Sequence, residues 1–199
     1  MKKTVLNAAL VLVATLLIAL MPTEAEAEIY EDTLRLHILA ENDSKGAQAL
    51  KLEVRDRLLA EYGTRLSTSG DVDAAIENAA ELLPEIEASC EVWCRELGSP
   101  ADVTVTLTEE WYDTREYESF TLPAGYYRSL RVIIGEGEGR NWWCVMYPPL
   151  CLGIATEDAP ADDSVIDYTR EEISLIESSG YRVKFKLLEI FSEAFKKNS

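Results

Sequence analysis

The apolar residues of this 199-residue chain follow two different periods, and this change of period constrains the fold more than any other feature. Leucine and isoleucine alternate with polar residues from Leu34 to Ile38, which is typical of a half-buried strand. From Val72 to Leu97 the apolar positions instead recur every three or four residues, which indicates one face of a helix. A chain with both patterns has to bury sheet and helix faces in a common core.

The other segments repeat these two patterns. A second helix is predicted after a cap at Asp43 or Ser44, with Gly63 at its end. Pro84 should kink or divide the helix over 72–97, whose end is marked by Gly98. The remaining elements that the spacing predicts are strands at 103–107, 130–134 and 181–187 and helices at 166–178 and 187–195. The glycine turn at 135–139 suggests a hairpin between antiparallel neighbours.

These elements predict an α+β fold, namely a two-layer domain with a mainly antiparallel sheet and helices packed on one face. Because the strands alternate and are not apolar throughout, we expect the other face of the sheet to be wet. Arg35 and His37 alternate with the leucines of the first strand. Their side chains would therefore point to the wet face.

The N-terminus has the three-part pattern of a secretory signal. Two lysines near the start are followed by an apolar stretch over Ala8–Met21 and then by an Ala-x-Ala site. We predict cleavage after Ala27, so that residues 1–27 are a signal peptide and residues 28–199 form a single extracytoplasmic domain. The alternative is an uncleaved anchor, since the apolar stretch is nearly as long as a membrane-spanning helix.

The charge of the chain excludes several classes of partner. Acidic residues outnumber basic ones by 36 to 19, and the formal net charge is −17. A field of this sign repels phosphate backbones, so we expect no nucleic-acid partner and contact with a membrane only through the signal or anchor segment. The acidic loop over 155–164 lacks the ligand spacing of a calcium site, and we expect neither a metal nor a cofactor.

Four cysteines in an extracytoplasmic domain allow three pairings if all of them are bridged. Cys90 and Cys94 stand four residues apart in a predicted helix, where the rigid backbone disfavours a mutual bridge, so we expect both to be free and buried. Cys144 and Cys151 flank a pair of prolines that can bend the chain. We favour a disulfide between these two.

A thiol hydrolase is the one nucleophilic enzyme that the residues suggest. It would use Cys144 as the nucleophile and His37, the only histidine, as the base. A disulfide at Cys144 would abolish this chemistry, because the nucleophile has to be a free thiolate. A lone histidine on the polar side of a strand is more commonly exposed or in contact with a partner, so this enzyme is the alternative hypothesis.

The remaining candidates are polar and aromatic residues of the kind that dominate binding energy at protein interfaces. They lie on the first strand, on the helix that follows it, and close to the second pair of cysteines. Our hypothesis for a partner-binding surface consists of Arg35, His37, Asp43, Gln48, Lys51, Arg55, Trp142 and Trp143.

Three segments, at 34–55, 122–151 and 183–191, resemble the stage II sporulation protein R family of endospore-forming Firmicutes. The most specific block runs from Asn-Trp-Trp-Cys through Pro-Pro-Leu-Cys within the second segment. The resemblance implies a non-enzymatic signalling protein, secreted from the forespore into the space between the forespore and mother-cell membranes. It also implies a partner, a membrane-embedded aspartic protease that processes pro-sigma-E in the mother cell. The resemblance does not assign the contact residues.

Overall fold

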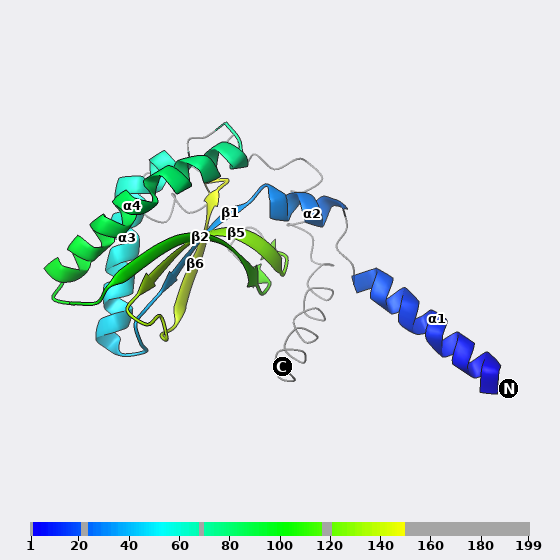
Figure 1. Cartoon of the computed structure of the whole chain (residues 1–199). Helices are drawn as coiled ribbons and strands as arrows, with labels where there is room; N and C mark the ends of the chain where they lie inside the picture. Colours follow the sequence, from blue (N-terminus) through cyan, green and yellow to red (C-terminus); the bar gives the residue numbers. More distant parts are fainter. Residues whose placement is uncertain (1, 21–23, 68–69, 117–120, 150–199) are drawn as a thin grey trace. The chain divides into compact units, whose positions relative to one another are not determined.

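The structure is a computed structural model, and it describes residues 2–20, 24–67, 70–116 and 121–149 (Figure 1). The helices are α1 (Lys2–Leu20), α2 (Glu24–Glu31), α3 (Lys45–Ser67) and α4 (Val72–Glu96). The strands are β1 (Leu34–Leu39), β2 (Val103–Tyr112), β3 (Arg115–Glu116), β4 (Thr121–Leu122), β5 (Gly125–Ile134) and β6 (Asn141–Tyr147). Cys151, the acidic loop over 155–164 and the three elements expected beyond residue 165 lie outside the described residues.

The chain divides into two compact units. The first comprises residues 1–29, 112–125 and 169–199, and its described part contains α1 and the antiparallel pair β3 and β4. The second comprises residues 30–111 and 126–168 and contains α3, α4 and a four-stranded sheet. None of the helices in the described ranges is sufficiently long and apolar to span a membrane. The signal peptide over 1–27 and the single domain over 28–199 stay predictions.

The four-stranded sheet has the order β2-β5-β1-β6. β1 runs parallel to β5 and antiparallel to β6, in a sheet that is mostly antiparallel. Both α3 and α4 pack against β1 on the same side of the sheet, and α3 also packs against β6 and α4 (Figure 1). The predicted α+β fold with helices on one face is confirmed.

The glycine turn at 135–139 does not form the expected hairpin, because β1 lies between β5 and β6. The turn instead crosses the end of β1, where the backbone N–H of Gly139 donates to the carbonyl of Ala40 at 2.8 Å. A Cβ on Gly139 would lie only 2.3 Å from the carbonyl oxygen of Asn42, so this crossing requires glycine. A hairpin and a crossing of one strand have the same local pattern of strand, glycines and strand, so the sequence pattern could not separate them.

β1 is a central strand, and all six of its residues are buried. Successive side chains alternate between the two faces of a strand, so Arg35 and His37 lie opposite Leu34 and Leu36. Their exposed fractions are 0% for Arg35 and 6% for His37. The expectation that these two side chains face water is therefore wrong, because the Tyr127 ring of β5 packs on Arg35 and the Trp143 ring of β6 stacks on His37.

α3 begins as predicted and ends later than predicted. The Ser44 hydroxyl accepts from the backbone N–H of Ala47 at 3.2 Å, which caps the helix. The expected end at Gly63 is wrong, since the helix continues to Ser67. Leu66, one turn beyond the glycine, is completely buried. Packing of this last turn outweighs the weak tendency of one glycine to end a helix.

α4 is capped by Asp71, whose carboxylate accepts from the backbone N–H of Ala74 at 2.8 Å. The helix passes through Pro84 without being divided and is followed by Gly98 with a φ of +81°. The predicted apolar stripe lies in the core at most of its positions, although Leu97 is exposed. The buried residues of this helix are Val72, Ala75, Ala79, Leu82, Ile86, Cys90, Trp93 and Cys94.

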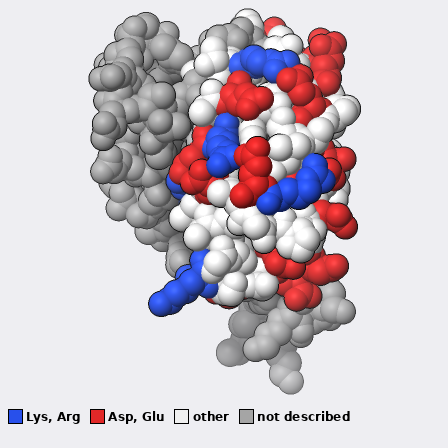
Figure 2. Space-filling model, turned by 90° about the vertical axis from the view of Figure 1, so that its left-hand side faces the viewer, with Lys and Arg blue, Asp and Glu red and all other residues white. Residues whose placement is uncertain are grey.

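Ion pairs connect the outer surfaces of α3 and α4. Arg65 donates to both carboxylate oxygens of Glu85, at 2.8 and 3.0 Å, and Arg57 donates to Glu96 at 2.8 Å. The hydrogen bonds from Arg65 lower the pKa of Glu85. Figure 2 shows one face of the molecule, on which basic groups lie among a larger number of acidic ones. Exposed pairs of this kind stabilise a fold by about 1 kcal/mol or less each.

Cys90 and Cys94 are both free and completely buried, as expected from the sequence. Burial raises the pKa of Cys94 and raises the pKa of Cys90 to about 12. A buried thiol with a raised pKa has little thiolate at neutral pH and is a poor nucleophile. These two cysteines are therefore structural residues of the core.

We expect Cys90 and Cys94 not to react with a thiol reagent at pH 8 while the protein is folded, and two thiols per chain to react in guanidinium chloride. The folded-state pKa of Cys90 is raised above its ordinary value of 9.0, so stability is retained below pH 9 and falls as the pH rises toward 12. Thiol titration of folded and denatured protein, with urea unfolding between pH 7 and 10, measures both effects. Rapid labelling of the folded protein would contradict this account.

Candidate functional site

The structure divides the eight candidate residues into a buried set and a more exposed set. Arg35, His37 and Lys51 are at most 6% exposed. A partner cannot reach these three side chains in this structure, and the expectation that they form part of an accessible surface is wrong. The other five candidates, Asp43, Gln48, Arg55, Trp142 and Trp143, are exposed or half-buried.

The side chain of Arg35 is buried among residues of the neighbouring strands. Its guanidinium carbon lies 4.9 Å from the centre of the Tyr127 ring, in cation–π geometry. On the neighbouring strands it is in register with Ser129 and Val145, both completely buried. Arg35 is among the largest side chains with no exposed surface, and we assign it to the core.

His37 belongs to a row of side chains that crosses all four strands of the sheet. Its Nδ1 lies 2.9 Å from Oε1 of Glu110 on β2, and Nε of Arg131 on β5 lies 3.9 Å from the other oxygen of that carboxylate. On the opposite side, the Trp143 ring stacks on the imidazole with the ring centres 5.5 Å apart. Glu110 was not among the residues predicted from the sequence, because only the fold of the sheet brings it to His37.

The geometry separates Cys144 from His37. In the pairing of β1 with β6, Cys144 is opposite Leu36, whereas His37 is opposite Trp143. Because side chains alternate along a strand, Cys144 and His37 point to opposite faces of the sheet. Cys144 is also disulfide-bonded. The hypothesis of a Cys144–His37 nucleophilic pair is therefore wrong. Since Cys151 lies outside the described residues, its pairing with Cys144 stays a prediction.

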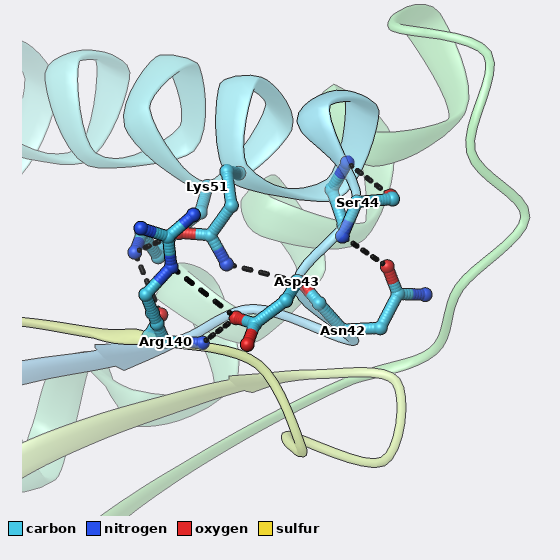
Figure 3. A network of polar contacts seen from close by, with 7 residues as sticks. Asn42, Asp43, Ser44, Lys51 and Arg140 are labelled. Atoms are coloured by element: carbon cyan, nitrogen blue, oxygen red, sulfur yellow. Dashed lines mark hydrogen bonds and ion pairs between the residues drawn. The ribbon is translucent and has the colours of Figure 1, made fainter.

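Polar side chains come together where the loop after β1 meets the start of α3 and the start of β6 (Figure 3). Oδ1 of Asp43 accepts from the backbone N–H of Arg140 at 2.7 Å and lies 3.4 Å from the Nε of Arg140. The side-chain oxygen of Asn42 accepts from the backbone N–H of Ser44 at 2.9 Å, and the backbone carbonyl of Asn42 accepts from the Gln48 side chain at 3.0 Å. These contacts connect the loop to both neighbouring elements.

Lys51 lies beneath this network and joins α3 to the residue that precedes β6. Its Nζ donates to Oε1 of Gln48 at 2.8 Å and to the carbonyl oxygen of Arg140 at 2.7 Å. Burial lowers the pKa of Lys51, the charges of Arg140 and Arg55 lower it further, and Asp43 acts in the opposite direction. Lys51 is therefore a positioning residue, which holds Arg140 at the surface.

Arg55 and Trp142 complete the cluster. The guanidinium carbon of Arg55 lies 5.0 Å from the centre of the Trp142 ring, and the same guanidinium pairs with Asp56 at 2.6 Å. We define the α3–β6 surface as Asp43, Gln48, Arg55, Arg140 and Trp142. Arg140 was missed by sequence analysis, because its position depends on the crossing of residues 135–139 over β1. Among the described residues, no group of three or more His, Cys, Asp or Glu side chains is arranged to hold a metal ion.

Comparison with known proteins gives two matches. The family model for stage II sporulation protein R matches residues 30–157. The Stage II sporulation protein R of Bacillus subtilis (strain 168) is 30% identical over 186 residues, with 84% of this chain and 83% of that protein covered. No solved structure matches this chain.

Proposed function

Because the chain belongs to the stage II sporulation protein R family and is a sporulation signalling protein, we propose that it activates a membrane-embedded aspartic protease. The activated protease processes pro-sigma-E in the mother cell. The signalling protein is made in the forespore and exported into the space between the two membranes.

The observation that carries this proposal is the family match over 30–157, which spans β1, both long helices and the whole four-stranded sheet. The sequence pattern of residues 1–27 supports export. The positions of Cys144 and His37 on opposite faces of the sheet support a role without catalysis, because they remove the one nucleophile and base that the sequence suggested. The partner is then the extracytoplasmic part of the protease, and contact with the membrane is limited to the N-terminal segment.

Complementation tests this function. We expect the full chain, produced in the forespore of a Bacillus subtilis strain that lacks its own stage II sporulation protein R, to restore conversion of pro-sigma-E to sigma-E. An immunoblot for the two forms of the sigma factor, sampled through early sporulation, measures the conversion.

A variant without residues 2–27 is the matched control, because it keeps the folded part and loses the predicted export signal. This variant should accumulate in the forespore and leave pro-sigma-E unprocessed. Absence of processing with an exported and stable full chain would contradict the proposed function. Full processing by the variant without the export signal would contradict the proposed location.

A further inference from the structure

We propose that the α3–β6 surface docks an acidic peptide segment of the protease, with carboxylates bound by Arg55 and Arg140 beside the Trp142 ring. The inference rests on the proposed function for the identity of the protein that carries this segment. The chemistry of the segment follows from the charges, exposure and contacts of the surface itself.

The α3–β6 surface and the buried Lys51 beneath it have an excess of cations within an acidic protein. The charged groups that act on Lys51 are Arg55, Arg140 and Asp43, so three cations meet around one carboxylate. Asp56 pairs with Arg55 from the outer side, and the cations still outnumber the carboxylates. The chain as a whole has a net charge of −17. An incoming carboxylate would reduce the repulsion among the three cations, whereas an incoming cation would increase it.

Arg140 has the donors that a carboxylate needs. Its side chain is 73% exposed, and its ion pair within the described part of the chain joins Nε to Asp43 at 3.4 Å. This contact uses Nε, so the two terminal nitrogens of the guanidinium can bind both oxygens of a carboxylate. The exposed arginine Arg65, in contrast, already uses two nitrogens on the carboxylate of Glu85.

The surface is held in place before a partner arrives. The backbone of Arg140 is fixed by Asp43 at its N–H and by Lys51 at its carbonyl, at 2.7 Å each. Arg55 is held over the Trp142 ring. Groups that are already ordered lose less conformational entropy on binding, and tryptophan and arginine are the side chains most enriched at energetic centres of interfaces.

A charge-reversal variant tests the docking. We expect Arg55→Glu combined with Arg140→Glu to reduce pro-sigma-E processing at least tenfold, while the melting temperature stays within a few degrees of wild type. If the reversed charges disturb the fold, the neutral double variant Arg55→Gln and Arg140→Gln is tested in place of the charge-reversal variant. Arg65→Glu is the matched control, because it reverses an exposed arginine of the same helix outside the surface, and it should process normally.

Direct binding provides a readout that does not depend on the protease. Purified full chain should bind a capped, dye-labelled hexaglutamate peptide, and the charge-reversal variant should bind it at least fivefold more weakly than both wild type and Arg65→Glu. Equal binding by all three proteins, or normal processing by a stable charge-reversal variant, would overturn the docking proposal. Inorganic phosphate that binds as tightly as the peptide and shows the same loss would also overturn it. If wild type itself fails to restore processing, the proposed function fails, and the peptide experiment still tests the chemistry of the surface.

Discussion

Arg35→Ala should destabilise the protein by about 2–5 kcal/mol, since it removes a large buried side chain and leaves a cavity. Arg35 has no exposed surface and lies 4.9 Å from the Tyr127 ring centre. Arg35→Met retains much of the aliphatic volume of the side chain, so it should lose less stability than Arg35→Ala. Urea unfolding of the three proteins measures the difference.

Arg140→Ala is the control for this prediction. The Arg140 side chain is 73% exposed, and substitutions at such positions usually change stability by about 0.5 kcal/mol or less. If Arg35→Ala lost no more stability than Arg140→Ala, then Arg35 would be a surface residue, as the alternating sequence pattern suggests. The buried position of Arg35 would then be wrong.

The second large effect is expected at the disulfide. If Cys144 pairs with Cys151, either Cys→Ser substitution opens the same loop and should cost about 2.5 kcal/mol on the chain-entropy model. Because the same single bond is lost in each case, the double variant should lose no more stability than either single variant. Urea unfolding of both single variants and the double variant, with pro-sigma-E processing as a second readout, measures this prediction.

Equal losses from the two single substitutions are the critical result. If Cys144→Ser abolished processing while Cys151→Ser left processing and stability intact, this pairing would be excluded. That result would also restore a chemical role for the Cys144 thiol, which the disulfide bond at Cys144 argues against.

Local sequence patterns placed several of the main elements of the fold, although no strand was predicted over β6. The alternation around Leu36 predicted β1, and the stripe through Ile86 predicted α4. The same patterns could not predict the order of the strands. The crossing at 135–139 depends on the approach of Gly139 to the backbone of Asn42, far away in the sequence. Strand order is a property of such long-range contacts, which a local period does not contain.

The candidate site was predicted only in part, again because it depends on contacts between residues that are distant in sequence. Gln48, Lys51 and Arg55 were placed on the helix that follows the first strand, and Lys51 does contact Gln48 in the structure. Their exposure was not predictable from that placement. Lys51 is buried because Arg140, brought over by the crossing, supplies a carbonyl for its ammonium group. A polar residue is buried wherever a partner satisfies it, and the partner of Lys51 is distant in sequence.

Reconstitution in a host that does not form spores tests the central claim most directly. The host would produce pro-sigma-E, the membrane-embedded protease and this chain, and an immunoblot would measure the fraction of pro-sigma-E converted. If the chain activates the protease, conversion requires all three proteins and is lost when the chain is omitted. Conversion to the same extent without the chain, or no conversion when all three proteins are present and folded, would contradict the account.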